Sequence, residues 1–126
     1  MNQLFVYGTL LHGEERAGFV TDLTARPATI RGNLWRAPAG YPALFLDADG
    51  AEISGEVLSL NRPGILATLD LIEGTKEGLY TRTTAPIMTE NGQEQAWVYV
   101  MSRLQLRQAG CRPTKATDWR KLTRRY

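Results

Sequence analysis

The chain has 126 residues, of which 43% are hydrophobic and 22% charged, a composition typical of a globular protein with one core. No apolar run approaches the roughly 20 residues that cross a bilayer, and the N-terminus lacks the basic and long apolar regions of a signal peptide. The single cysteine, Cys111, cannot form an internal disulfide and favours a reducing compartment. We therefore expect a cytoplasmic protein without membrane association. As a separate expectation, we take it to be a monomer.

The formal net charge of +2 is unevenly distributed along the chain. Residues 1–101 carry seven Lys or Arg against twelve Asp or Glu, whereas residues 102–126 carry eight against one. A basic segment of this kind can contact a polyanion. No nucleic-acid-binding motif accompanies it, so we favour a solvated segment that packs against the acidic body, and we expect no nucleic-acid partner.

Apolar patterns predict six strands, and the first of them ends at an unusual turn. Surface turns are usually built from Asn, Asp, Pro and Gly, but this one keeps Leu10 and Leu11 and is expected to stay partly inside. An Asn91-Gly92 pair marks a hairpin between the last two strands. In chain order, the predicted strands cover residues 3–7, 28–37, 43–47, 52–60, 79–88 and 95–101.

Two helices are predicted between these strands. Residues 13–23 form a short amphipathic segment that Pro27 would end. The second helix, residues 65–73, has Asn61 as its expected N-cap, and Gly74 suits the left-handed position just past its end.

This order of elements predicts an α+β fold with mostly antiparallel pairing, which can curl into a small barrel with a few flanking helices. Residues 1–126 are expected to form a single domain, because the chain contains no repeat, low-complexity stretch or linker. The basic segment 102–126 remains unassigned in this scheme. Its end, "TDWRKLTRRY", is compatible with a short amphipathic helix or a docked tail.

A carboxylate interrupts the apolar stripe of the second predicted helix. At ~100° per residue, Glu73 falls at about 80°, between Leu69 at about 40° and Leu66 at about 100°. Two interpretations remain open. Glu73 can bend into water where the last turn frays, or it can point into a pocket. There, burial and the helix C-terminus would raise its pKa and make it a better general base.

Other chemistries find little support in the sequence. Nothing pairs Cys111 with the single histidine, His12, as a nucleophile and base. One histidine and one cysteine are too few for a typical transition-metal site, and "DADG" at residues 47–50 fits a β-turn better than a calcium loop. Thr9 is best explained as a turn residue that bonds the local backbone. We expect no metal and no cofactor.

Five short motifs stand in order along residues 4–101. They are Tyr7-Gly8-Thr9-Leu10, Gly40-Tyr41-Pro42, Gly55-Glu56-Val57, Leu69-Asp70 to Glu73-Gly74 with Tyr80 and Arg82 after it, and Ala96 to Tyr99. In this order and spacing they resemble the gamma-glutamylcyclotransferase-like family, which includes gamma-glutamylamine cyclotransferases and their bacterial and plant relatives.

The resemblance implies a small mixed barrel and an enzyme that converts a small γ-glutamyl molecule to 5-oxoproline and a free amine. It also implies a cavity lined by Tyr7, Gly8, Thr9 and Leu10, with Glu73 as the catalytic general acid and base. Some bacterial relatives lack this glutamate, so its presence here favours activity. The segment after residue 101 has no counterpart in the resemblance.

Two further residues of the motifs, Tyr80 and Arg82, have roles that the resemblance does not fix. Tyr80 is either a substrate-binding wall of the cavity or a half-buried strand residue. Arg82 is expected to be a structural ion-pair partner rather than a substrate ligand. Two alternative functions remain: a binding module of the same fold that has lost turnover, and a nucleic-acid-associated protein that uses residues 102–126.

Overall fold

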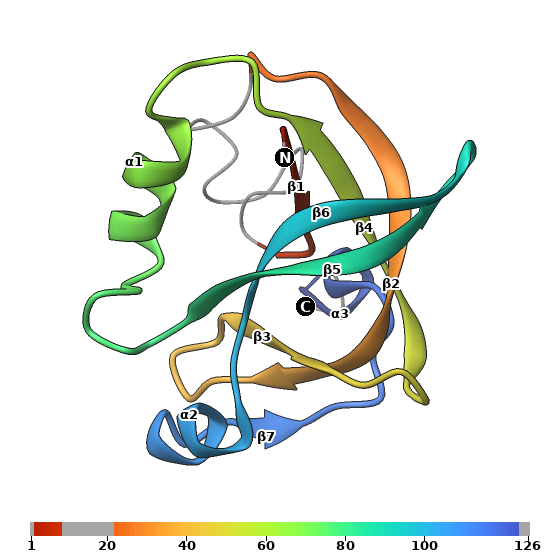
Figure 1. Cartoon of the computed structure of the whole chain (residues 1–126). Coiled ribbons are helices and arrows are strands. Elements are labelled where there is room, and N and C mark those ends of the chain that lie inside the picture. Colours follow the sequence, from red (N-terminus) through yellow and green to blue (C-terminus); the bar gives the residue numbers. More distant parts are fainter. Residues whose placement is uncertain (1, 9–21, 124–126) are drawn as a thin grey trace.

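The computed structural model describes residues 2–8 and 22–123, with the side chains of residues 122 and 123 left aside. Seven strands and three helices form within these residues (Figure 1). They are β1 (Gln3–Val6), β2 (Ala25–Arg36), β3 (Pro42–Leu46), β4 (Ala51–Ser59), α1 (Ile65–Ile72), β5 (Thr81–Thr89), β6 (Gly92–Val100), α2 (Arg103–Gln108), β7 (Arg112–Pro113) and α3 (Trp119–Thr123). No helix in this part of the chain is long and apolar enough to span a membrane.

Five of the strands close into a barrel. The sheet runs β2-β4-β1-β6-β5, and a pairing of β5 with β2 at Ala28 and Thr29 completes the ring. Every pairing is antiparallel except that of β1 with β6, where Leu4 lies opposite Trp97. Strands β3 and β7 extend the sheet by pairing with the far end of β2. The predicted α+β fold with a mixed, mostly antiparallel barrel is confirmed.

Alternation along β1 separates two apolar clusters. Phe5 belongs to one buried cluster, together with Ile30, Ile53 and Val98. Leu4 and Val6, the residues on either side of Phe5, belong to a second cluster. The second cluster includes Leu69 of α1 and Leu106 of α2, so it joins helices to the sheet. Because successive strand residues point to opposite faces, the single strand β1 serves both clusters.

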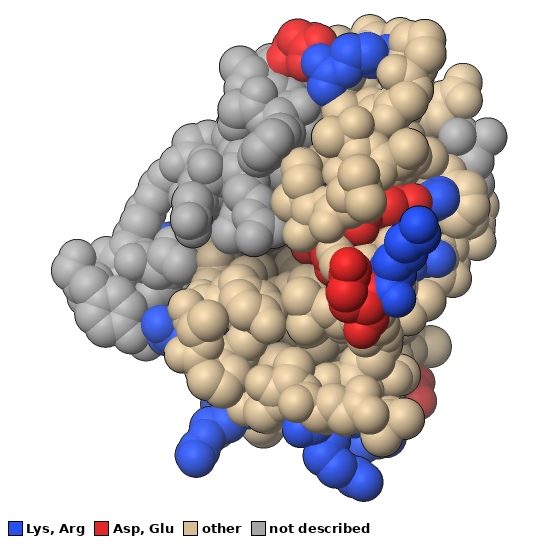
Figure 2. All heavy atoms as spheres, turned by 90° about the vertical axis from the view of Figure 1, so that its left-hand side faces the viewer, with Lys and Arg blue, Asp and Glu red and all other residues tan. Residues whose placement is uncertain are grey.

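The described part of the basic segment, residues 102–123, is part of the fold. Helix α2 begins at a capping box made by Ser102 and Gln105, and the first residue of α3, Trp119, is 2% exposed within the same cluster as Phe5. The end of the segment thus contains a short helix, α3, and is docked on the barrel through Trp119, so the two interpretations are compatible. Figure 2 shows Lys and Arg side chains at the lower end of the molecule, where Figure 1 places α2 and β7. The exposed basic residues of these two elements are Arg103, Arg107 and Arg112.

Two details of the predicted elements need correction, and one predicted helix lies mostly outside the described residues. Strand β2 begins at Ala25 and carries Pro27 opposite Glu56, so this proline lies inside a strand instead of ending a helix. The N-cap of α1 is Gly64, with φ +76°, because a turn at Arg62 separates Asn61 from the helix. The predicted helix 13–23 lies outside the described residues except for its last two positions.

A polar cluster on four barrel strands makes stability depend on pH. Glu94 accepts hydrogen bonds from Arg26 at 3.0 Å, Gln3 at 2.9 Å and Thr89 at 2.7 Å. These bonds, that of Arg26 foremost, lower the pKa of Glu94 from 4.5 to about 2. A carboxylate whose pKa is depressed by folding stabilises the protein above its unfolded pKa, and that stabilisation is lost as the pH falls.

We therefore expect the free energy of unfolding to fall between pH 4.5 and pH 2, and Glu94→Gln to flatten this part of the profile. Urea unfolding across this pH range measures the effect. Glu52→Gln is the matched control, because Glu52 pairs with Arg31 at an exposed site. The side chain of Glu52 is 63% exposed and that of Arg31 is 57% exposed. An identical pH profile for Glu94→Gln and the parent would contradict the assignment.

Candidate active site

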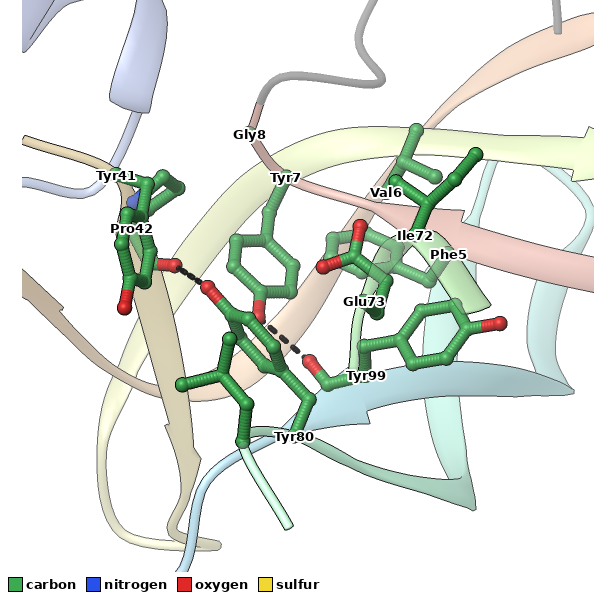
Figure 3. A pocket seen from close by; sticks show the side chains of 11 residues that line it. Phe5, Val6, Tyr7, Gly8, Tyr41, Pro42, Ile72, Glu73, Tyr80 and Tyr99 are labelled. Atoms are coloured by element: carbon green, nitrogen blue, oxygen red, sulfur yellow. Dashed lines mark hydrogen bonds between the residues drawn. The ribbon is translucent and has the colours of Figure 1, made fainter. Parts of the chain in front are cut away.

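A pocket of about 70 Å³ lies where β1 ends, α1 ends and β3 begins (Figure 3). It is lined by Phe5, Val6, Tyr7, Gly8, Tyr41, Pro42, Ile72, Glu73, Leu79, Tyr80 and Tyr99. Most of these side chains are aromatic or aliphatic, and Glu73 is the one charged residue among the described members. Within residues 2–8 and 22–123, no three His, Cys, Asp or Glu side chains are placed to hold a metal ion together.

Glu73 is 8% exposed and lines this pocket, so the interpretation that it bends into water is wrong. It is the C-cap of α1 and keeps helical backbone angles, with its N–H bonded to the carbonyl of Leu69 at 2.9 Å. Figure 3 shows its carboxylate on the pocket side, in the direction of Tyr7.

A Schellman motif explains why the last turn does not fray. Gly74 has φ +66°, and its N–H donates to the carbonyl of Leu71. The next residue, Thr75, donates its N–H to the carbonyl of Asp70 at 3.1 Å. These two bonds satisfy carbonyls that a helix end leaves open, so the predicted role of Gly74 is confirmed and Glu73 is fixed at an ordered helix terminus.

Tyr7 forms one wall of the pocket, and its hydroxyl is occupied by the backbone. It donates to the carbonyl of Tyr99 at 2.5 Å (Figure 3). It also accepts from the N–H of Leu44 at 3.2 Å. Burial, followed by the nearby Glu73 carboxylate, raises the pKa of Tyr7 above its ordinary value. Tyr7 therefore stays a neutral phenol whose hydroxyl is engaged by two backbone groups.

Tyr80 forms a second wall of the pocket. It is 6% exposed and precedes β5, so the alternative of a half-buried strand residue is wrong. Its hydroxyl donates to the carbonyl of Pro42 (Figure 3). Burial is the largest cause that raises the pKa of Tyr80, and the nearby Glu73 carboxylate adds to it. The ring of Tyr41 lies 6.2 Å from that of Tyr80 and tilts against it. The rings of Tyr41 and Tyr80 thus form one aromatic side of the pocket.

Gly8 is required by packing. A Cβ added at this position would collide with the pyrrolidine ring of Pro42. Within the described residues, the neighbouring proline therefore explains the glycine at this position. Thr9 and Leu10, the other two residues expected to bind substrate in this turn, lie outside the described residues.

Arg82 is the ion-pair partner that the sequence predicted. Its Nε and terminal nitrogen donate to the two carboxylate oxygens of Asp70 at 2.9 and 3.2 Å, and its guanidinium lies 4.3 Å from the ring centre of Trp97. Tyr99, which lines the pocket, donates its hydroxyl to Asp70 at 2.7 Å. Sequence reasoning missed Tyr99 and Pro42 as pocket residues, although both stand in the motifs that carried the resemblance.

Comparison with known proteins gives the family. The model of the family described as "Gamma-glutamyl cyclotransferase, AIG2-like" matches residues 4–121. A curated relative, the gamma-L-glutamyl-butirosin B gamma-glutamyl cyclotransferase of Niallia circulans, is 29% identical over 126 residues, which are 95% of this chain and 76% of that protein. Both findings support a gamma-glutamyl cyclotransferase activity in general.

Solved structures share the fold at lower identity. YkqA of Bacillus subtilis matches with a TM-score of 0.74 and 23% identity over 95% of this chain, which spans 40% of that longer protein. An AIG2-like protein of Mus musculus matches with a TM-score of 0.68 and 24% identity, covering 81% of this chain and 78% of the mouse chain. The fold, the family model and the curated relative agree, and the chain belongs to the AIG2-like gamma-glutamyl cyclotransferase family.

Proposed function

We propose that the protein converts a γ-glutamyl amine, or a related γ-glutamyl conjugate, to 5-oxoproline and a free amine, with Glu73 as general acid and base. The observation that carries this proposal is the placement of a single buried carboxylate in a pocket otherwise walled by aromatic and aliphatic side chains. Family membership supports the reaction class, and the small pocket supports a small-molecule substrate.

The reaction needs a proton carrier but no protein nucleophile. In a γ-glutamyl compound, the α-amine of the substrate attacks its own γ-carbonyl carbon and closes a five-membered lactam. The C–N bond to the leaving amine then breaks. The α-amine is mostly an ammonium at neutral pH, so it must first lose a proton. A second proton leaves the same nitrogen as the lactam forms. Glu73 takes these two protons in turn and passes them to the nitrogen of the departing group, which leaves as an ammonium ion, so that atoms and charge balance.

The pocket walls supply orientation. The substrate must fold back so that its amine meets its γ-carbonyl, and enclosure by the rings of Tyr7 and Tyr80 favours such a compact conformer. Backbone N–H groups of Gly8, Thr9 and Leu10 would hold the carbonyl oxygen as it gains negative charge. This last assignment rests on the resemblance and on the position of Gly8 in the pocket.

A substrate panel tests the proposal. We expect at least one γ-glutamyl amine or γ-glutamyl amino acid to release 5-oxoproline and an equal amount of free amine, measured by liquid chromatography and mass spectrometry. The matched control is the same compound acetylated on its α-amine, which has no nucleophile and should yield no product. Release of glutamate instead of 5-oxoproline, or turnover of the acetylated compound, would overturn the proposal because water would then be the nucleophile.

A further inference from the structure

A single carboxylate, that of Asp70, connects the helix that carries Glu73 to two strands of the barrel. It accepts two hydrogen bonds from Arg82 of β5 and one from the Tyr99 hydroxyl of β6. The Asp70 and Arg82 side chains are 26% and 25% exposed, so the pair is only partly open to solvent. A two-point bond between a carboxylate and a guanidinium fixes orientation as well as distance.

Helix α1 needs such a connection. It has eight residues, a length at which a helix is not stable by itself, and Ile65 and Leu69 are its fully buried side chains. Both lie in its first five residues, whereas Glu73 follows its last one. Leu69 packs the start of the last turn against the barrel, but the helix residues after it, Asp70 to Ile72, are half-buried or exposed. Asp70 supplies a contact to the barrel from within this turn.

The geometry links Asp70 to the pocket in two ways. Asp70 and Glu73 are three residues apart, so they lie on neighbouring positions of one helical face. Tyr99, which donates its hydroxyl to Asp70, also lines the pocket and accepts the hydroxyl of Tyr7 at its backbone carbonyl. A shift of Asp70 would therefore move Glu73 through the helix, and it would move Tyr7 through Tyr99.

We propose that Asp70, held by Arg82 and Tyr99, is a positioning residue that fixes the Glu73 carboxylate in the reactive geometry. This inference rests on the proposed function of Glu73. It does not place Asp70 in contact with the substrate, because the carboxylate of Asp70 is already engaged by three donors and Asp70 is not among the pocket-lining residues. Its effect is expected on the rate of proton transfer rather than on substrate affinity.

The test is Asp70→Asn, which keeps the shape of the side chain and removes its charge. A displacement of about 1 Å in a reacting group can cost on the order of 100-fold in rate, so we expect kcat to fall by roughly 10- to 100-fold with KM unchanged. Arg82→Lys keeps the positive charge but loses the two-point bond. Its kcat should lie between that of the parent and that of Asp70→Asn. Glu52→Gln, which breaks the exposed pair with Arg31, is the control and should leave kcat unchanged.

Coupling to Glu73 distinguishes positioning from a general loss of structure. If Asp70 acts through Glu73, adding Asp70→Asn to Glu73→Gln should lower the residual rate no further. Equal fractional losses in both backgrounds, or a rise in KM with kcat unchanged, would overturn the positioning role.

Hydrogen exchange supplies a readout that does not need activity. The N–H groups of Glu73 and Thr75, bonded to Leu69 and Asp70, should exchange faster in Asp70→Asn than in the parent. Unchanged exchange with unchanged kcat would refute the inference while Glu73→Gln still tests the proposed function. If the parent converts no γ-glutamyl compound to 5-oxoproline, the proposed function fails, and the exchange experiment still decides whether Asp70 holds the turn.

Discussion

Glu73→Gln is expected to lower kcat for 5-oxoproline formation by about 10²- to 10⁴-fold, the range that a lost general base typically costs. Glutamine keeps the shape of the side chain and its place in the pocket, but it cannot accept the proton of the substrate ammonium. Because the buried carboxylate is replaced by a neutral group, the free energy of unfolding should not fall in parallel. Steady-state rates and urea unfolding of the same preparation separate the two effects.

The matched control for this variant is Glu77→Gln. Glu77 lies four residues further along the chain and is exposed, so its neutralisation changes the net charge equally without touching the pocket. We expect the control to keep the parental rate. A Glu73→Gln variant that released 5-oxoproline as fast as the control would show that another group carries the proton.

Gly8→Ala is expected to lower the free energy of unfolding by about 1–3 kcal/mol, the usual cost of forcing extra volume into a packed site. The added methyl would meet the ring of Pro42, which cannot rotate away as a flexible side chain could. Since the carbonyl of Pro42 accepts the Tyr80 hydroxyl, any shift of the proline also moves a pocket wall. Turnover should therefore fall together with stability, and urea unfolding and kcat/KM measure both.

Gly92→Asn provides the comparison for Gly8→Ala. Gly92 opens β6 with φ +98°, a conformation that asparagine tolerates better than most residues, and an added Cβ meets no described atom within 4 Å. Any cost of this variant comes from backbone strain at a positive φ and not from a collision, so turnover should stay unchanged. A Gly8→Ala variant with parental stability and turnover would show that the contact of Gly8 with Pro42 is not what requires a glycine in the first turn.

Features that depend on neighbours in the chain could be predicted from the sequence. The position of Glu73 in the apolar stripe and the left-handed Gly74 both follow from helical periodicity and local backbone preference, and the structure places both as expected. The β5–β6 hairpin likewise follows from alternation on either side of an Asn-Gly pair. The sequence prediction failed at Asn61, where a turn at Arg62 delays the helix start, and at Pro27, which pairs with Glu56 of β4 inside a strand.

Contacts between distant residues could not be predicted in this way. The hydroxyl partners of Tyr7 and Tyr80 lie 92 and 38 residues away along the chain, and neither partner has a local signature. The contact of Gly8 with Pro42 and the burial of Trp119 in the cluster of Phe5 also have no local sequence signature. Such pairs are set by strand register and barrel closure, which the sequence pattern does not specify. A single domain over residues 1–126, a monomeric state and a cytoplasmic location stay predictions.

The structure of the Glu73→Gln variant bound to an unreacted γ-glutamyl amine tests the central claim most directly. The variant should trap the substrate, because the base that starts the cyclisation is missing. We predict the γ-glutamyl group between the rings of Tyr7 and Tyr80, with its α-amine within about 3.2 Å of the residue 73 side chain, the reach of a proton-transfer hydrogen bond. A γ-glutamyl group bound outside this pocket, or an α-amine turned away from residue 73, would contradict the account.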